Sequence, residues 1–318
     1  MPRIEPAVTT LWYTVADGVS YIDLAKDLSM VNRRLYRQGM VYAIQDVQVG
    51  LPSGMRSSDV FQATFSVIPN SWIAHNAWKK AFATWRSEQR KVTDAIGPIH
   101  GKWQDFKIYL DDSHEDGTTL GPVAGDSGAF SSGEWEHSKF VFDDDGTERE
   151  LKMHMIGSSN LADTNNESGI GLINEYQNSR ANQDALQPLL PGGASETIYA
   201  KLMGTDDMSD MIVDNVEGDN DRSPYDPDDY PGGDTNGDAA QLVQIMSVSS
   251  QQSVGRAPGF VAPCGLVRIE TNEIALNDVD PTAVNAAVYA DGTAATALIG
   301  ITVAVGPYRG VLATPMGQ

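Results

Sequence analysis

The sequence predicts a mainly β protein, folded as an antiparallel double-sheet jelly roll with two helices inserted between early strands and with long surface loops. About ten segments have the alternating or β-branched character of strands, only two segments have helical spacing, and no internal repeat is present. A parallel strand–helix–strand arrangement fits poorly, because most neighbouring strands lack a helix between them. We expect a single domain over residues 1–318.

The first third of the chain holds both predicted helices. The first covers residues 21–39 and ends at Gly39, since glycine is a common helix stop. The second covers residues 70–92. Strands rich in β-branched and aromatic residues are predicted at 9–16, 40–49, 60–68, 105–112, 139–142, 150–156, 195–203, 241–249, 264–270 and 297–305.

One hairpin can be placed in register from its turn. Asp145-Gly146 is a strong two-residue turn signal, and a turn centred there pairs Phe140 with Leu151 and Phe142 with Arg149. The same register sets His137 opposite His154. Two such histidines can bind a metal, but spacing fixes no third ligand, so a structural β-ribbon is the better prediction.

The helix at 70–92 has an aromatic stripe and a basic arc. Trp78, Phe82 and Trp85 recur at i, i+4 and i+7, which predicts that they are buried. Asn70 or Ser71 is placed to cap the first turn. The basic arc beside the stripe is either a solvated face or a binding surface. Its members are Lys79, Lys80, Arg86, Arg90 and Lys91.

Charge is distributed unevenly along the chain. The whole chain carries a formal net charge of −21, yet residues 1–110 hold 13 basic and 9 acidic side chains. Residues 111–318 hold 9 basic and 34 acidic side chains. Two poles in one molecule suggest two surfaces that face different surroundings, although a general bias towards solubility in salt explains the acidic pole equally well.

The acidic pole is densest at residues 214–238. This segment reads as an exposed irregular loop, too long for a simple connection. Its DTNGD stretch resembles the start of a calcium loop, with Asp234, Asn236 and Asp238 as candidate ligands. The spacing does not continue into a twelve-residue loop, so we expect at most adventitious Ca²⁺ binding and no cofactor.

Catalytic motifs are missing from the sequence. It contains no GxSxG, P-loop, GxGxxG or HExxH pattern, and its single cysteine, Cys264, has apolar neighbours typical of a buried thiol. We therefore expect no enzyme, although a glycosidase using scattered carboxylates stays a minor alternative. No stretch of 18 uninterrupted apolar residues is present, so no membrane span is expected.

Several phrases carry a resemblance to a known family. NRRLYRQG (32–39), NSWIAHNAWKKAFATW (70–85), GLINEYQNSRA (171–181), PYDPDDYPGG (224–233), APCGLVRIE (262–270) and GPYRGVLATPMGQ (306–318) resemble capsid proteins of small circular Rep-encoding single-stranded DNA viruses, many of them known from aquatic samples. The likeness runs from about residue 9 to the C-terminus and rests on phrases, not on a mechanistic motif. It implies a jelly roll of the viral capsid type, located in the virion, that self-assembles into an icosahedral shell around circular single-stranded DNA.

One departure from that family concerns the genome. Many of those proteins open with an arginine-rich arm, whereas this chain has only Arg3 among its first 25 residues. The negative charge of the genome phosphates must then be neutralised by the folded surface, by counterions or by another basic protein. The candidate DNA-binding residues, which can instead pair with an acidic neighbouring subunit, are Arg33, Arg34, Arg37, Lys79, Lys80, Arg86, Arg90 and Lys91.

The expected partners are therefore further copies of this chain and a single-stranded DNA genome. A host receptor is implied by the resemblance but cannot be identified. The main alternative function is a non-catalytic jelly-roll binding module, either lectin-like or a virion spike, because jelly rolls serve both roles.

Overall fold

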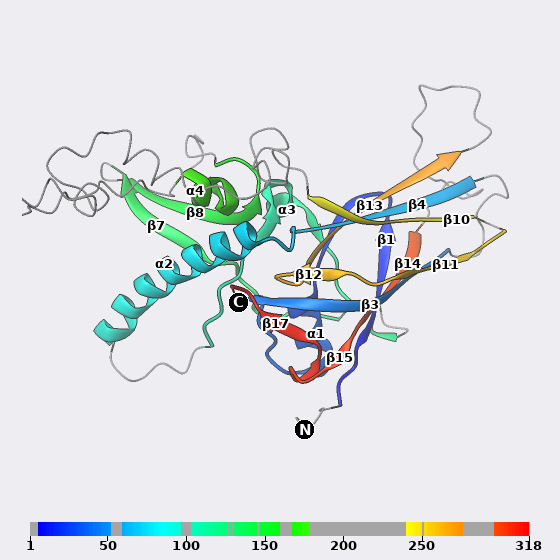
Figure 1. Ribbon diagram of the computed structural model, residues 1–318, viewed down its shortest axis with the longest axis horizontal. Coiled ribbons are helices and arrows are strands. Elements are labelled where there is room, and N and C mark those ends of the chain that lie inside the picture. The colour runs from blue at the N-terminus through cyan, green and yellow to red at the C-terminus, as the bar shows by residue number, and fades with distance from the viewer. Residues whose placement is uncertain are drawn as a thin grey trace, which may run out of the picture.

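The computed structural model describes residues 6–51, 59–96, 103–125, 128, 130–144, 147–159, 167–178, 240–249, 251–275 and 296–317. Over these residues the protein is mainly β, as predicted, with several antiparallel sheets (Figure 1). The predicted strand at 195–203 and the predicted acidic loop at 214–238 lie outside the described residues.

The first of two large sheets contains both early and late strands of the chain. Its order is β1 (Thr10–Ala16), β14 (Thr296–Val303), β3 (Met40–Gly50) and β11 (Val254–Pro258), and each neighbouring pair is antiparallel. The other end of β3 pairs with β12 (Val261–Pro263) and β17 (Ala313–Pro315). A short hairpin of β15 (Val305–Gly306) and β16 (Gly310–Val311) lies between β14 and β17 in the chain.

The second large sheet uses the strands that remain. Its order is β10 (Gln241–Ser249), β4 (Asp59–Val67), β13 (Leu266–Ala275) and β2 (Gly18–Asp23), again antiparallel throughout. The two-residue strand β6 (Thr118–Thr119) runs parallel to β2 at the edge.

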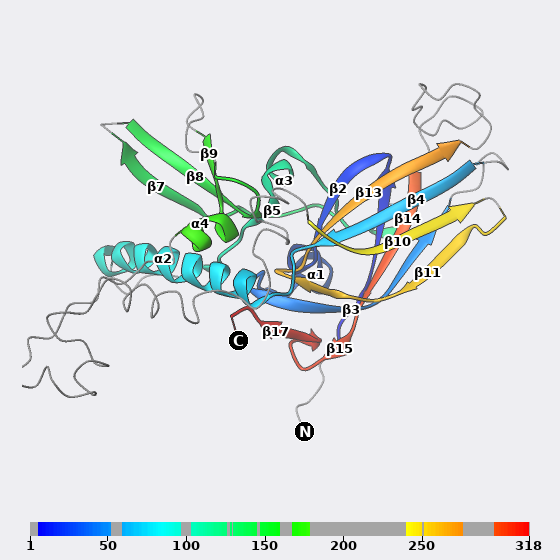
Figure 2. The same ribbon diagram turned by 45° about the horizontal axis from the view of Figure 1, so that its top comes forward.

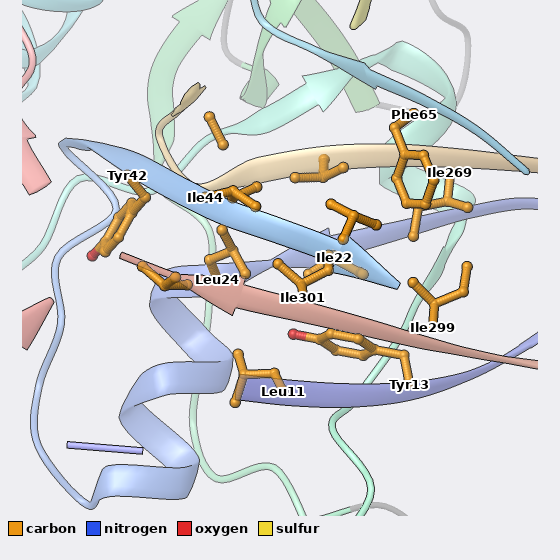
Figure 3. Close-up of a cluster of buried hydrophobic side chains, with 14 of the residues drawn as sticks. Leu11, Tyr13, Ile22, Leu24, Tyr42, Ile44, Phe65, Ile269, Ile299 and Ile301 are labelled. Atoms are coloured by element: carbon orange, nitrogen blue, oxygen red, sulfur yellow. The ribbon is translucent and has the colours of Figure 1, made fainter. Parts of the chain in front are cut away.

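A shared apolar core joins the two sheets. In β1, Leu11, Tyr13 and Val15 are buried while Trp12 between them is exposed, since successive strand residues point to opposite faces. These side chains meet others from β3, β4, β13 and β14 in one cluster (Figure 3). The two sheets therefore form a β-sandwich with a common interior.

A long insertion separates β4 from β10 in the chain. It contains α2 (Trp72–Ile96), β5 (Tyr109–Asp111), α3 (Asp112–Asp116), β6, β7 (Lys139–Asp144), β8 (Thr147–Ile156), β9 (Glu167–Gly171) and α4 (Leu172–Asn178). In this insertion β8 pairs with β5, β7 and β9. Both ribbon views place α2, α4, β7 and β8 beside one end of the sandwich (Figures 1 and 2). A second core, which includes Tyr21, Val41 and Leu266 of the sandwich, holds the insertion in place.

The predicted first helix is too long at both ends. Residues Gly18–Asp23 form β2, because their backbone pairs with β13, and the helix α1 (Leu24–Asn32) starts only afterwards. The Asp23 carboxylate caps α1 by accepting the N–H groups of its first turn, and α1 ends at Arg33, which has a φ of 53°.

The hairpin register is confirmed where the two strands pair. Phe140 lies opposite Leu151 and Phe142 opposite Arg149. The ladder stops at Lys139 and Lys152, so the predicted pairing of the two histidines is wrong. Instead, the backbone of Tyr109 in β5 lies beside His154 in the sheet.

Candidate nucleic-acid interface

The helix α2 presents the predicted basic arc to solvent. It begins after Ser71, whose Oγ accepts the N–H of Ala74 at 3.3 Å, so the cap is the second of the two candidates. Trp78 and Trp85 are buried, as predicted, and Phe82 is half-buried. Phe106 from the insertion packs against these rings, at a centroid distance of 5.6 Å from Trp85. With one side fixed in this way, α2 exposes all five predicted cations.

Three predicted arginines from two separate segments meet in one groove. Arg86 and Arg90, four residues apart on α2, line an open cavity of about 350 Å³ together with Arg37. We call this cavity the basic groove. Its remaining lining residues are Phe82, Trp85, Gln89, Thr93, Asp94, Gln104 and Asp105.

The backbone on each side of Arg37 is held in place by hydrogen bonds. The Arg37 N–H donates to the Tyr308 hydroxyl at 3.1 Å, and the Arg37 carbonyl accepts the Tyr42 hydroxyl at 2.7 Å. The next N–H, that of Gln38, donates to the Asp105 carboxylate at 3.0 Å. This irregular segment is thereby fixed beside α2, which the sequence could not reveal because two of the three partners, Tyr308 and Asp105, are remote in the chain.

The other predicted cations are spread more widely. Arg33 is exposed and Arg34 half-buried, and both lie outside the basic groove. Lys79 lies beside the C-terminal segment, with its Nζ 3.5 Å from the carbonyl oxygen of Gly317. Lys80 lines a separate, mostly apolar cavity between α2 and α4, and Lys91 lies outside the groove.

The electrostatics of the basic groove favour an anion. Three guanidinium groups face two carboxyl groups, those of Asp94 and Asp105. Burial raises the pKa of Asp105 to about 6, against the opposing effect of Lys107 and Arg37. Asp105 therefore carries less than a full charge near pH 6, which weakens the acidic side of the groove.

A second cavity adjoins the basic groove. It has a volume of about 530 Å³ and shares Trp85, Gln89, Gln104 and Asp105 with the groove. We call it the polar pocket. Its other lining residues are Trp103, Lys107, Glu134, Glu136, His137, Ser138, Lys139 and Glu150. Among these, the sequence pointed to a possible site only at His137, and there as one of two cross-strand histidines.

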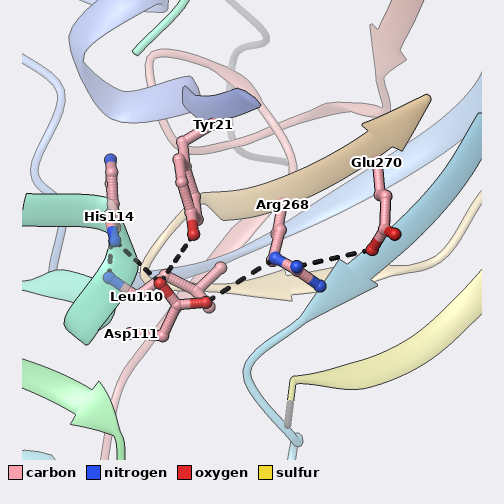
Figure 4. A network of polar contacts seen from close by, with 6 residues as sticks. All are labelled: Tyr21, Leu110, Asp111, His114, Arg268 and Glu270. Atoms are coloured by element: carbon pink, nitrogen blue, oxygen red, sulfur yellow. Dashed lines mark hydrogen bonds and ion pairs between the residues drawn. The ribbon is translucent and has the colours of Figure 1, made fainter. Parts of the chain in front are cut away.

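A buried polar network fixes the insertion to the sandwich near these cavities (Figure 4). The Asp111 carboxylate accepts the Tyr21 hydroxyl at 2.8 Å and the backbone N–H of His114 at 2.9 Å. Its second oxygen lies 3.9 Å from Nε of Arg268, which also contacts Glu270. Strands β2, β5 and β13 are thus tied together by charge-assisted contacts.

The predicted metal sites gain no support from the described residues. Among them, no group of three or more His, Cys, Asp or Glu side chains is arranged to hold a metal ion. Tyr109 stacks on His137 at a centroid distance of 3.8 Å, and His154 contacts the Ser158 carbonyl instead. Asp234, Asn236 and Asp238 lie outside the described residues.

The chain matches no protein-family model, no curated protein and no solved structure. The resemblance of its phrases to viral capsid proteins therefore stays a prediction. Every helix in the described part of the chain is too short or too polar to cross a membrane.

Proposed function

We propose that this chain is a non-catalytic viral capsid protein whose sandwich is an eight-stranded jelly roll. The supporting observation is the pairing of the eight long sandwich strands: the first pairs with the eighth, the second with the seventh, the third with the sixth and the fourth with the fifth. Such nested pairs arise when one long hairpin is wrapped into two sheets, which is the topology of a jelly roll.

Assembly into a shell follows from this topology together with the resemblance of the sequence. Jelly rolls occur in viral shells and in lectin domains, so the fold alone does not select between them. The phrases at 70–85 and 262–270 favour the shell, because they resemble capsid proteins of single-stranded DNA viruses and form α2 and the turn into β13. The virion is then the location of the protein.

Shell formation is tested by size-exclusion chromatography and negative-stain microscopy of the purified protein. We expect closed particles of uniform diameter. A monomer that binds a glycan column would contradict the proposal and favour the lectin-like alternative.

The shells should depend on dissolved ions. Subunits that each carry a net charge of −21 repel one another unless salt or Ca²⁺ screens them. We expect particles to loosen at low ionic strength with a chelator and to re-form when salt or Ca²⁺ is restored, as light scattering would record. Scattering that is indifferent to both treatments would count against charge-screened assembly.

Within such a shell, the basic groove is the proposed contact with the single-stranded DNA genome. Arginine side chains bind phosphate through paired N–H groups, and contacts of this kind need no particular base sequence. Arg37, Arg86 and Arg90 supply three such side chains from rigid backbone on two segments. An acidic surface of a neighbouring subunit is the competing partner for the same groove.

Reversing the three charges separates these two partners. In Arg37→Glu/Arg86→Glu/Arg90→Glu, binding of a 20-nucleotide dT oligomer should weaken at least about tenfold at low salt, and the slope of log K against log salt should fall by about 2. Fluorescence polarisation measures both quantities. The matched control is Arg256→Glu, an exposed arginine outside the groove that is not among the candidate DNA-binding residues, and this variant should bind normally. Normal dT binding by the triple variant would exclude the genome contact, and normal binding with failed shells would assign the groove to a subunit interface.

A further inference from the structure

The basic groove and the polar pocket share one wall. The groove has the chemistry to bind the phosphate of a nucleotide, and the pocket has the chemistry to bind its base. On α2, Trp85 precedes Arg86 and Gln89 precedes Arg90, so both groove arginines of this helix follow a residue that lines both cavities. The groove offers cations to a phosphate. The pocket offers aromatic, amide, carboxylate and ammonium groups, which are the groups that bind an unstacked base.

One of the two lysines that line the polar pocket, Lys107, is held in a fixed position. The Nζ of Lys107 lies 5.2 Å from the ring centroid of Trp103 and 4.6 Å from that of Trp135, and the residue is only 9% exposed. Trp135 is itself anchored, because its Nε1 donates to the Asp23 carboxylate at 2.9 Å. The same Nζ also donates to the backbone carbonyl of Glu136 at 3.4 Å, so several contacts fix this ammonium group in the wall of the pocket.

One wall atom lacks a hydrogen-bond partner within the described structure. The Nε2 atom of His137 is buried without a partner there, and His137 lines the polar pocket. Buried polar atoms are nearly always paired, so an exception calls for an explanation such as a ligand. A neutral imidazole nitrogen can donate to or accept from a base or a sugar hydroxyl.

The carboxyl groups of the pocket favour one kind of base edge. Asp105, Glu134 and Glu136 are acceptors when ionised, and Lys107 is a donor. Guanine presents two adjacent N–H donors beside a carbonyl acceptor, which matches a carboxylate next to an ammonium. Thymine presents a single N–H between two carbonyls, so it leaves acidic acceptors of the pocket without donors.

We infer that the two cavities together bind one unstacked nucleotide of single-stranded DNA, with its phosphate on Arg86 and Arg90 and its base, preferentially guanine, in the polar pocket. The inference rests on the proposed genome contact and adds base selectivity to it. A shell built this way contacts its genome at guanines in preference to other bases.

The test is a titration of the protein with dGMP, dAMP, dCMP and dTMP, followed by calorimetry and by the fluorescence of the pocket tryptophans. We expect dGMP to bind about tenfold more tightly than dTMP, which is the discrimination that one well-placed paired contact provides. Equal affinities for dGMP and dTMP would overturn the inference, as would binding of a neutral sugar such as galactose with no response to dGMP.

Two variants assign the parts of the site. Glu134→Gln/Glu136→Gln changes exposed side chains only and should abolish the preference for dGMP while leaving dTMP binding unchanged. Arg86→Glu/Arg90→Glu should weaken all four nucleotides alike. Glu88→Gln, on α2 but outside both cavities, is the matched control and should alter neither property. A preference that survives the double glutamate change would refute the assignment of the base to the polar pocket.

Shell formation, scored separately by microscopy, distinguishes this inference from the proposed function. Shells that show no nucleotide preference would contradict only the inference that the polar pocket binds a base. A dGMP preference in a protein that forms no shells would defeat the capsid proposal and leave the nucleotide site standing.

Discussion

When the pH falls from 7.5 to 5, His137→Phe is expected to gain about 2 kcal/mol of unfolding free energy relative to the parent protein. Burial is the main cause that lowers the pKa of His137 to about 3, and interactions with His114, Lys107 and Lys26 act in the same direction. Urea denaturation at the two pH values measures the change.

The direction of this stability change follows from the pH at which the unfolded and the folded chain each protonate His137. The unfolded chain protonates His137 near pH 6.5, whereas the folded chain keeps it neutral down to about pH 3. Stability is therefore complete above pH 6.5 and is lost as the pH falls, by about 1.36 kcal/mol per unit. Phenylalanine keeps the stack on Tyr109 and cannot titrate.

A comparison between variants removes the contribution of other groups. Burial raises the pKa of Asp105 to about 6, which acts in the opposite direction, but this contribution is common to parent and variant and cancels. The control is Tyr109→Phe, which changes the other ring of the stack and titrates in neither state over this range. A His137→Phe curve parallel to that of the parent would show that His137 is not buried as described.

The substitution Gln38→Met is expected to lower the unfolding free energy by about 4 kcal/mol, which is a large part of the total for a typical domain. The Gln38 amide is fully buried and bonds to both backbone groups of Ile108, donating to its carbonyl at 3.0 Å and accepting its N–H at 2.6 Å. Methionine has similar volume but leaves both groups unpaired, at about 2 kcal/mol each.

The loss of stability should be greatest around Ile108, because the Gln38 amide joins the insertion to the sandwich there. Gln38 further donates to the Asp23 carboxylate at 3.1 Å, so one side chain connects α1, β2 and the segment before β5. Hydrogen exchange at the Ile108 amide should therefore accelerate more than exchange in β3. The control Gln48→Met removes a part-buried contact to Asp46 and should cost less than about 1 kcal/mol. Equal losses in the two variants would refute a special role for Gln38.

The sequence predicted well those elements whose periodicity is strong. The strand β1 alternates over seven residues, and α2 repeats its aromatic stripe over two turns, so local pattern and burial agree in both. The hairpin of β7 and β8 was placed in register because its turn residues fix the pairing.

The sequence failed where a remote partner decides the local structure. The predicted helix began at residue 21 because Ile22 has helical spacing with Ala25 and Leu28, but pairing with β13 makes residues up to Asp23 part of a strand. Ile108 lies in a segment with the alternating pattern of a strand. Its backbone N–H and carbonyl nevertheless pair with the Gln38 side chain and not with a neighbouring strand.

The candidate site was predicted in part. The cations of α2 were identified from their spacing, whereas the position of Arg37 beside them depends on Tyr42 and Tyr308, which no local pattern connects. The polar pocket was missed because α2, β7, β8 and the irregular segments between them each contribute only a few of its residues, and no single periodic pattern connects these contributions.

The nested order of the sandwich strands has a consequence for biogenesis. Thr10 in β1 pairs with Thr302 in β14, so the outermost pair of the nest cannot form until nearly the whole chain has left the ribosome. At about 10 residues per second, β1 waits about half a minute for its partner. During that time the alternating apolar side chains of β1 have no sheet to cover them, and nascent chains on one messenger lie close together. In the proposed assembly, a subunit therefore becomes competent to associate with others only after the chain has been translated past Thr302.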